Sequence, residues 1–158
     1  METLAPRLLR YCLARTGDAG LAEEAAQDAL TALVRRWRRY GPPDNADGFA
    51  FAIARRRALR ALVRRRLLAP LDALGMAHKC QHPGSNTERA IEQRDELQRT
   101  LAALSHLGHR DRESILLAAV GELDTAAAAE ALGISSSAFK MRLHRARQRL
   151  DTLLETDR

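Results

Sequence analysis

The stretch from Leu123 to Leu150, LDTAAAAEALGISSSAFKMRLHRARQRL, limits the fold of this chain more than any other. Gly133 follows an alanine-rich run, and glycine readily takes the left-handed conformation that ends a helix. Ser135 or Ser136 can cap a following helix by accepting a hydrogen bond from one of its free N–H groups. In that helix the apolar residues recur at spacings of four, three and four and share one face; they are Phe139, Leu143, Ala146 and Leu150. The stretch therefore predicts a helix-turn-helix.

The second helix of this motif is cationic away from its apolar face. The basic residues that lie largely off that face are Lys140, Arg142, Arg145, Arg147 and Arg149. A helix that begins with small polar residues and has one buried stripe and a cationic remainder suits the major groove of DNA. The alternative is a solvated basic helix in an ordinary bundle.

The bulk composition agrees with a helical protein that binds a polyanion. Lys and Arg outnumber Asp and Glu by 26 to 20 in 158 residues, a net charge of +6. Only 4% of the residues are aromatic although 46% are hydrophobic, which favours helix bundles over sheets. Nucleic acid is the first expected partner. Two cysteines make no disulfide framework, and we expect Cys12 to be a small core residue.

No apolar run is long enough to cross a bilayer, and the start of the chain lacks the apolar core of a signal peptide. We therefore expect a cytoplasmic protein without membrane insertion.

Three helices are expected in the first part of the chain, at residues 4–15, 21–40 and 48–68. Gly41-Pro42-Pro43-Asp44 stops the second, and Asp47 is a candidate cap for the third. The apolar stripe expected on the second helix consists of Leu21, Ala25, Leu30, Leu33, Val34 and Trp37. Its early turns are acidic and its last turns basic, which complements the helix dipole.

The third helix carries seven arginines and no acidic residue among them: Arg55, Arg56, Arg57, Arg60, Arg64, Arg65 and Arg66. Pairing along the helix cannot balance this charge, so contact with phosphate is expected rather than a merely solvated face.

Residues 69–87 are predicted to be a linker, because Pro70, Gly75 and Pro83 interrupt them and they show no periodicity. His78, Cys80 and His82 alternate there, but they lack a fourth donor, so no metal site and no cofactor is expected. Ser85-Asn86-Thr87-Glu88 resembles a capping box. It opens a helix to about Leu104, and a further helix is expected over residues 109–120, packed through Ile115, Leu116 and Ala119. The sequence thus predicts an all-α chain of two small helical domains, residues 1–68 and 88–158.

At this point the chain resembles a known family, the group IV or extracytoplasmic-function sigma factors of bacterial RNA polymerase. The residues 22–28, AEEAAQD, resemble the family's AEDxxQE-like segment, and residues 49–55, FAFAIAR, resemble its WLxxIAR segment. The most specific likeness is that of LGIS at 132–135 and KMRLHRAR at 140–147 to the LGIS…VKSRLHRAR signature. The resemblance covers nearly the whole chain.

The resemblance implies that the first module is sigma region 2 and the second sigma region 4. Region 2 would dock on the β′ clamp helices of core polymerase through Glu23, Glu24, Gln27 and Asp28. Its arginine helix and the preceding loop would meet the minus-ten element and hold the melted strand. Region 4, which sits near the β flap, would read the minus-thirty-five element through Ser136, Ser137, Lys140, Met141, His144 and Arg145. Other partners implied are promoter DNA and an anti-sigma factor.

Several positions depart from the family pattern. Phe49 and Ala50 replace the usual Trp and Leu, Arg56 stands where an Asn is usual, and Arg60 where an Asp is frequent. Ala127-Ala128-Ala129 replaces the EIA triplet, and Ser137-Ala138-Phe139 replaces Gly-Thr-Val. Phe139 could fill the space that Ala128 leaves. These changes bear most on reading of the minus-ten element.

Two other function classes remain open at this point. An ordinary helix-turn-helix regulator explains the second module but gives the first no role. A sigma-like adaptor that holds polymerase, an anti-sigma factor or DNA without starting transcription is suggested by Arg56 in place of Asn. An enzyme is not expected, because the chain offers no nucleophile with a base and no evident carboxylate pair.

Overall fold

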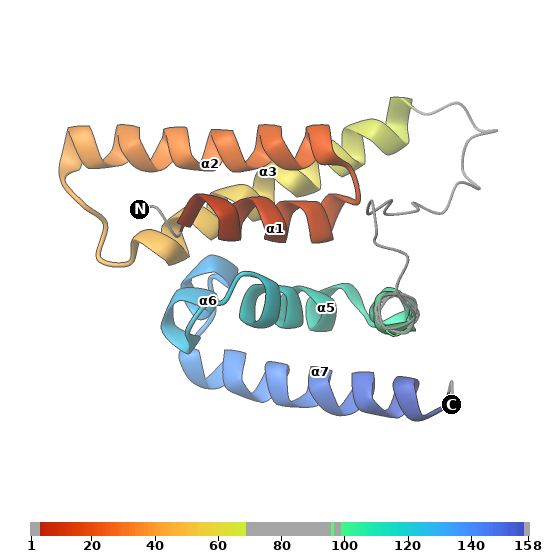
Figure 1. Cartoon of the computed structure of the whole chain (residues 1–158). Coiled ribbons are helices and arrows are strands. Elements are labelled where there is room, and N and C mark those ends of the chain that lie inside the picture. Colours follow the sequence, from red (N-terminus) through yellow and green to blue (C-terminus); the bar gives the residue numbers. More distant parts are fainter. Residues whose placement is uncertain (1–3, 69–95, 97–98, 157–158) are drawn as a thin grey trace, which may run out of the picture.

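A computed structural model describes residues 4–68, 96 and 99–156, and these contain helices but no strand. The first module comprises α1 (Leu4–Thr16), α2 (Ala19–Tyr40) and α3 (Ala46–Leu68). The second contains a helix at 99–106, then α5 (His109–Ile115), a π-helical turn (Leu116–Val120), α6 (Thr125–Leu132) and α7 (Ser136–Thr156). In Figure 1 the three helices of the first module lie together in the upper part of the molecule, and α5, α6 and α7 lie beneath them. The expected all-α architecture of two helical modules is confirmed.

The helices of the first module begin and end at residues that supply their missing hydrogen bonds. The Asp18 carboxylate accepts a hydrogen bond from Leu21 N at 2.9 Å and starts α2, which ends at Gly41 with φ +80°. Asn45, rather than the expected Asp47, caps α3, because its Oδ1 accepts a hydrogen bond from Gly48 N at 2.8 Å. Asp47 lies inside the first turn and pairs with Arg7 at 2.7 Å.

Alanines rather than large side chains form the buried face of α2. That face consists of Ala22, Ala25, Ala26, Ala29 and Leu33. Small side chains let α1 and α3 approach α2 closely, and the space is filled by Leu8, Tyr11 and Phe51, which are fully buried. The prediction that Trp37 belongs to the buried stripe is wrong, since 44% of its surface is exposed. Cys12 is buried, as expected.

The second module follows its local sequence signals closely. Asp124 caps α6 by accepting from Ala127 N at 2.8 Å, and Gly133 closes it in the left-handed conformation at φ +67°. Ser135, not Ser136, caps α7 by accepting from Ala138 N at 3.2 Å. Before α6, the expected single helix over 109–120 changes to a π-helical turn at Leu116, which buries Leu117 and leaves the expected core residue Ala119 exposed.

The two modules share a hydrophobic core. Leu8, Phe51 and Ala54 of the first module belong to the same buried cluster as Leu117 and Phe139 of the second. The alanines of α6 at 127–129 are buried in this cluster, and their small size permits α3 to lie against α6. A Cβ built on Gly48 of α3 would lie 2.8 Å from Glu130 Oε2 of α6. The three alanines that replace the family's EIA triplet thus lie where one module packs on the other.

Candidate nucleic-acid interface

The outer face of α7 carries all six side chains predicted to read DNA. Ser136, Ser137, Lys140, Met141, His144 and Arg145 are all exposed. The opposite face is anchored by Phe139, which is 1% exposed, and by Ala146, which is fully buried. The predicted stripe of Phe139, Leu143, Ala146 and Leu150 is thus confirmed as the inward face. Figure 1 shows α7 on the outside of the molecule, away from the first module.

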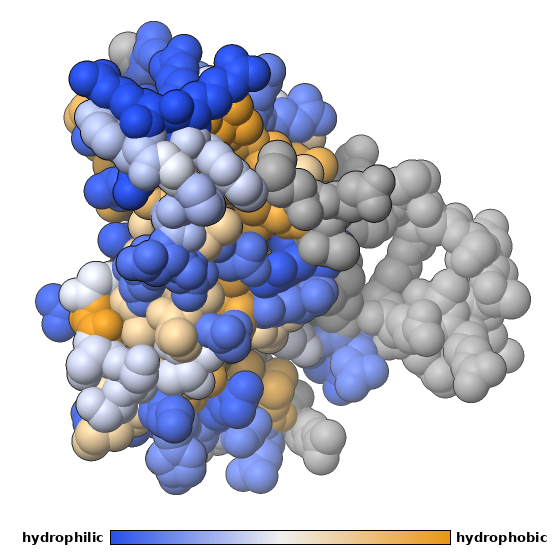
Figure 2. Space-filling model, turned by 90° about the vertical axis from the view of Figure 1, so that its left-hand side faces the viewer, coloured by the Kyte–Doolittle hydropathy of each residue, from blue (hydrophilic) through white to orange (hydrophobic). Residues whose placement is uncertain are grey.

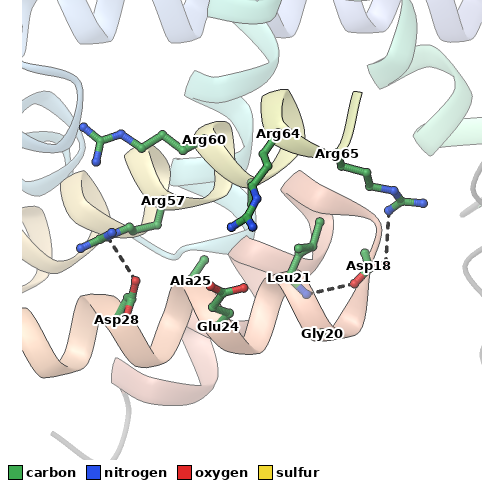
Figure 3. Close-up of a pocket in the computed structure, with 11 residues that line it drawn as sticks. Asp18, Gly20, Leu21, Glu24, Ala25, Asp28, Arg57, Arg60, Arg64 and Arg65 are labelled. Atoms are coloured by element: carbon green, nitrogen blue, oxygen red, sulfur yellow. Dashed lines mark hydrogen bonds and ion pairs between the residues drawn. The ribbon is translucent and has the colours of Figure 1, made fainter. Parts of the chain in front are cut away.

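A groove of about 550 Å³ between α2 and α3 brings together two predicted sites that the sequence analysis kept apart. Glu24 and Asp28 line its α2 wall, and Arg57, Arg60 and Arg64 line its α3 wall (Figure 3). Arg57 Nε lies 3.2 Å from Asp28 Oδ2, and Arg65 Nη1 lies 3.2 Å from Asp18 Oδ2. The charge of α3, which cannot be balanced within that helix, is partly balanced by α2.

The six α3 arginines whose side chains the structure describes fall into two groups. Three are engaged: Arg57 and Arg65 in these ion pairs, and Arg55, whose Nε donates to the Ala131 carbonyl of α6 at 3.2 Å. Arg56, Arg60 and Arg64 are exposed and have no ion pair with any residue of the described part of the chain. This second group is free to meet phosphate.

The acidic segment of α2 is displayed on the surface. Glu23, Glu24 and Gln27 are exposed, whereas Asp28 is half-buried and paired with Arg57. The first three residues are thus open to a partner, and the fourth is shared with α3.

The end of α2 carries an aromatic and cationic cluster that the sequence analysis did not place in a site. Tyr40 is 65% exposed, and the guanidinium carbons of Arg36 and Arg39 lie 5.1 Å and 5.2 Å from its ring centroid. Trp37 is exposed nearby on the same helix. Figure 2 views the molecule from the side on which α2 ends and shows strongly hydrophilic residues gathered at the top. The sequence RRWRRY at 35–40 could have indicated this cluster. Six consecutive helical residues point in all directions around the helix, so some of these aromatic and basic side chains must lie on the surface.

Neither a metal centre nor a membrane span is found in the described residues. No group of three or more His, Cys, Asp or Glu side chains lies close enough to hold an ion. No described helix is both long and apolar enough to cross a membrane. The alternating His78, Cys80 and His82, the linker at 69–87 and the capping box at 85–88 lie outside the described residues.

Comparison with known proteins gives the same two-part organisation. Residues 1–67 match the model of "Sigma-70 region 2", and residues 97–150 match that of "Sigma-70, region 4". The chain is 32% identical over 160 aligned residues to the ECF RNA polymerase sigma factor SigD of Mycobacterium tuberculosis. This alignment covers 95% of this chain and 73% of SigD. The chain is 27% identical to the ECF RNA polymerase sigma factor EcfG of Rhodopseudomonas palustris, over 96% of this chain and 81% of that protein.

Solved structures agree in fold. The sigma factor RpoE of Bartonella quintana, in complex with the anti-sigma factor NepR, superposes with a TM-score of 0.72 at 25% identity and covers 98% of this chain and 94% of its own. CnrH, in complex with the cytosolic domain of CnrY, superposes with a TM-score of 0.67 at 23% identity, over 96% and 82% of the two chains. Both sigma-70 regions are present in sequence order, and a relative is 32% identical over 95% of this chain and 73% of its own length. The chain therefore belongs to the extracytoplasmic-function group of sigma-70 family sigma factors.

Proposed function

We propose that this sigma factor brings core RNA polymerase to promoters by reading the minus-thirty-five element with α7 and the minus-ten element with the first module. The observation that carries the proposal is the exposed face of α7, whose opposite face is a buried apolar stripe, together with the exposed arginines of α3 in the first module. When two modules that each bind DNA weakly are joined in one chain, binding of one raises the effective concentration of the other at the promoter.

In the second module, Lys140 and Arg145 would position the helix on phosphates while Met141 and His144 meet base edges in the major groove. Ser136 and Ser137 stand at the start of α7, where free N–H groups favour an anionic phosphate. The same module would sit near the β flap of core polymerase.

In the first module, Arg56, Arg60 and Arg64 are our candidates for contact with the phosphates of the minus-ten region, because they are exposed and unengaged in the described residues. Arg55, Arg57 and Arg65 would contribute only after leaving their present partners. Trp37 and Tyr40 add exposed aromatic faces on which unpaired bases could stack.

The polymerase contact would be made by Glu23, Glu24, Gln27 and Asp28 on the β′ clamp helices. Exposure of the first three supports this role. We further propose a cytoplasmic location, no catalytic activity of the chain itself, and control by an anti-sigma factor, as with the Bartonella quintana protein that was solved with one. The domain limits 1–68 and 88–158 are part of the proposal.

Run-off transcription with core polymerase tests the function. We expect a defined transcript from DNA that co-purifies with the reconstituted holoenzyme, and none from core enzyme alone. A chain that binds core polymerase but yields no transcript from any recovered DNA would be an adaptor. Tight specific DNA binding without polymerase would instead indicate an ordinary regulator.

Two pairs of substitutions test the site residues. Replacing Lys140 and Arg145 with Ala should weaken binding of upstream-element DNA and leave core polymerase affinity unchanged. Replacing Glu24 with Gln and Gln27 with Ala should have the reverse effect. If each pair of substitutions reduces the affinities for DNA and for core polymerase equally, the assignment of polymerase binding to α2 and of DNA binding to α7 is wrong.

A further inference from the structure

Met141 is the one large apolar side chain exposed on α7, a helix whose residues Ser136–Thr156 are all described. It is 57% exposed and belongs to neither hydrophobic cluster, although both clusters contain residues of α7. The packing of the second module therefore does not require methionine at this position. The family signature VKSRLHRAR has serine here, so the apolar side chain is a departure of this chain.

Met141 lies opposite the buried stripe of α7. With about 100° between successive residues, its side chain points about 170° away from the middle of the inward stripe that includes Phe139. Its exposed neighbours on the same face are polar, with Ser137 one turn before it and His144 and Arg145 one turn after it. The first turns of a recognition helix are the part that reaches base edges, and Met141 lies in the second turn. Methionine thus occupies the centre of the face that would enter the major groove.

The methionine side chain cannot make the hydrogen bonds by which polar side chains distinguish bases. Its thioether sulfur is not a donor and is only a weak acceptor. The apolar group that base edges present in the major groove is the 5-methyl group of thymine, and apolar side chains contact it. Amino groups, ring nitrogens and carbonyl oxygens of other bases would lose water against methionine without gaining a hydrogen bond. Met141 therefore favours thymine through contact with the methyl group and disfavours the other bases through desolvation.

The surroundings of Met141 distinguish it from an ordinary exposed apolar residue. Single apolar side chains are common on protein surfaces and need no partner. Here, however, residues 136–150 include no Asp or Glu, and Lys140 and Arg145 are exposed close to Met141. A partner that fits this surface is anionic at its edges and offers a small apolar group at its centre. Duplex DNA with a thymine in the major groove has both properties, and the unbranched, flexible methionine can adjust to the position of the methyl group.

We propose that Met141 determines the specificity of α7 at one position of the upstream element by packing on the 5-methyl group of a thymine. The inference rests on the proposed reading of that element by α7, and it names the chemical group that the helix selects. Lys140 contacts phosphate and contributes equally to the binding of every sequence, whereas Met141 contributes only where the methyl group is present.

The test uses holoenzyme reconstituted from the full chain and core polymerase. DNA selected by the holoenzyme from a random library gives the upstream element, and each thymine in it is then replaced in turn by deoxyuridine, which lacks only the methyl group. We expect one replacement to weaken binding by the parent about 4-fold, the effect of returning one buried methyl group to water. The effect should disappear in Met141→Ser and persist in Met141→Leu, which keeps an apolar side chain of similar size.

Two controls separate the methyl contact from other effects. Lys140→Ala should weaken binding to all sequences alike at a fixed salt concentration and leave the deoxyuridine effect unchanged. The same pair of DNAs is compared with the parent and with Met141→Ser, so any effect of deoxyuridine on DNA shape cancels. If cytosine is placed at the sensitive position, 5-methylcytosine should bind better than cytosine by a similar factor, because it carries the same methyl group. Both substituted positions are exposed, so the variants should melt at the parent temperature.

Three results would overturn the inference. The first is an equal deoxyuridine effect in the parent and in Met141→Ser at every thymine, and the second is an upstream element without thymine. The third is weaker binding of Met141→Ser to core polymerase in the absence of DNA, which would assign Met141 to a protein contact. If the holoenzyme selects no upstream element at all, the proposed function fails together with the inference. An element that is selected without a methyl effect dependent on Met141 refutes the inference alone.

Discussion

Replacing Gly121 with Ala should destabilise the protein through the contact between its modules. Gly121 has φ −75° and ψ −15°, a conformation that alanine adopts freely, so any effect comes from crowding. The added methyl would lie 2.8 Å from both Phe51 Cε1 and the Leu117 carbonyl oxygen, and Phe51 is fully buried with no room to retreat. Overpacking of this kind costs about 1–3 kcal/mol.

At about 2–4 °C per kcal/mol for a chain of this size, the melting temperature should fall by about 2–12 °C. Far-UV circular dichroism during heating measures this directly, because the described secondary structure is helical. Gly20→Ala is the matched control: the site lies in the first turn of α2, and the new methyl would meet only Asp18 Oδ1, at 3.4 Å. We expect that variant to melt at the parent temperature or slightly above it. Equal melting temperatures for Gly121→Ala and Gly20→Ala would refute the close approach of Gly121 to Phe51.

Three further outcomes are expected. Asp124→Ala removes the carboxylate that caps α6 and should cost about 1 kcal/mol in an equilibrium unfolding measurement, with Asp124→Asn retaining most of the stability. Burial and the adjacent Arg15 lower the pKa of His109, so the packed state should lose stability as pH falls below about 6.5, the usual histidine value; melting curves between pH 7 and 5 should show this, and His109→Gln should flatten the change. The other charged groups facing His109 are Glu113, Arg112 and Arg55. Burial raises the pKa of Cys12 to about 12, so in a Cys80→Ser background iodoacetamide should label the thiol only when the protein unfolds; rapid labelling of native protein would contradict this.

The elements that could be predicted from the sequence are those that depend on neighbours in the chain. Gly133 and the following serines gave the turn of the helix-turn-helix, because a left-handed glycine and a capping hydroxyl act on adjacent backbone groups. The buried face of α7 followed from helical spacing alone. The six exposed residues of that helix were therefore placed on the correct side, although their contacts with DNA remain a prediction.

Predictions failed where the outcome depends on distant parts of the chain. Trp37 fits the spacing of an apolar stripe, but alanines fill the space between α2 and its neighbours, and the indole stays outside. Asp47 is a good capping residue, yet Asn45 takes that role while Asp47 meets Arg7 of another helix. Periodicity also carries no information about Tyr11 and Glu113, which pair across the modules.

The shared core has a consequence for how the protein can be divided or recombined. A fragment that ends near residue 68 would present Phe51 and Ala54 to water on one side, and the matching fragment would expose Leu117 and the alanines of α6. Separately expressed halves should therefore be prone to aggregate, and exchange of one half with that of a relative should succeed only when both sides of the core are exchanged together. The two sigma-70 regions match separate family models, but in this chain their sequences constrain each other through the shared core.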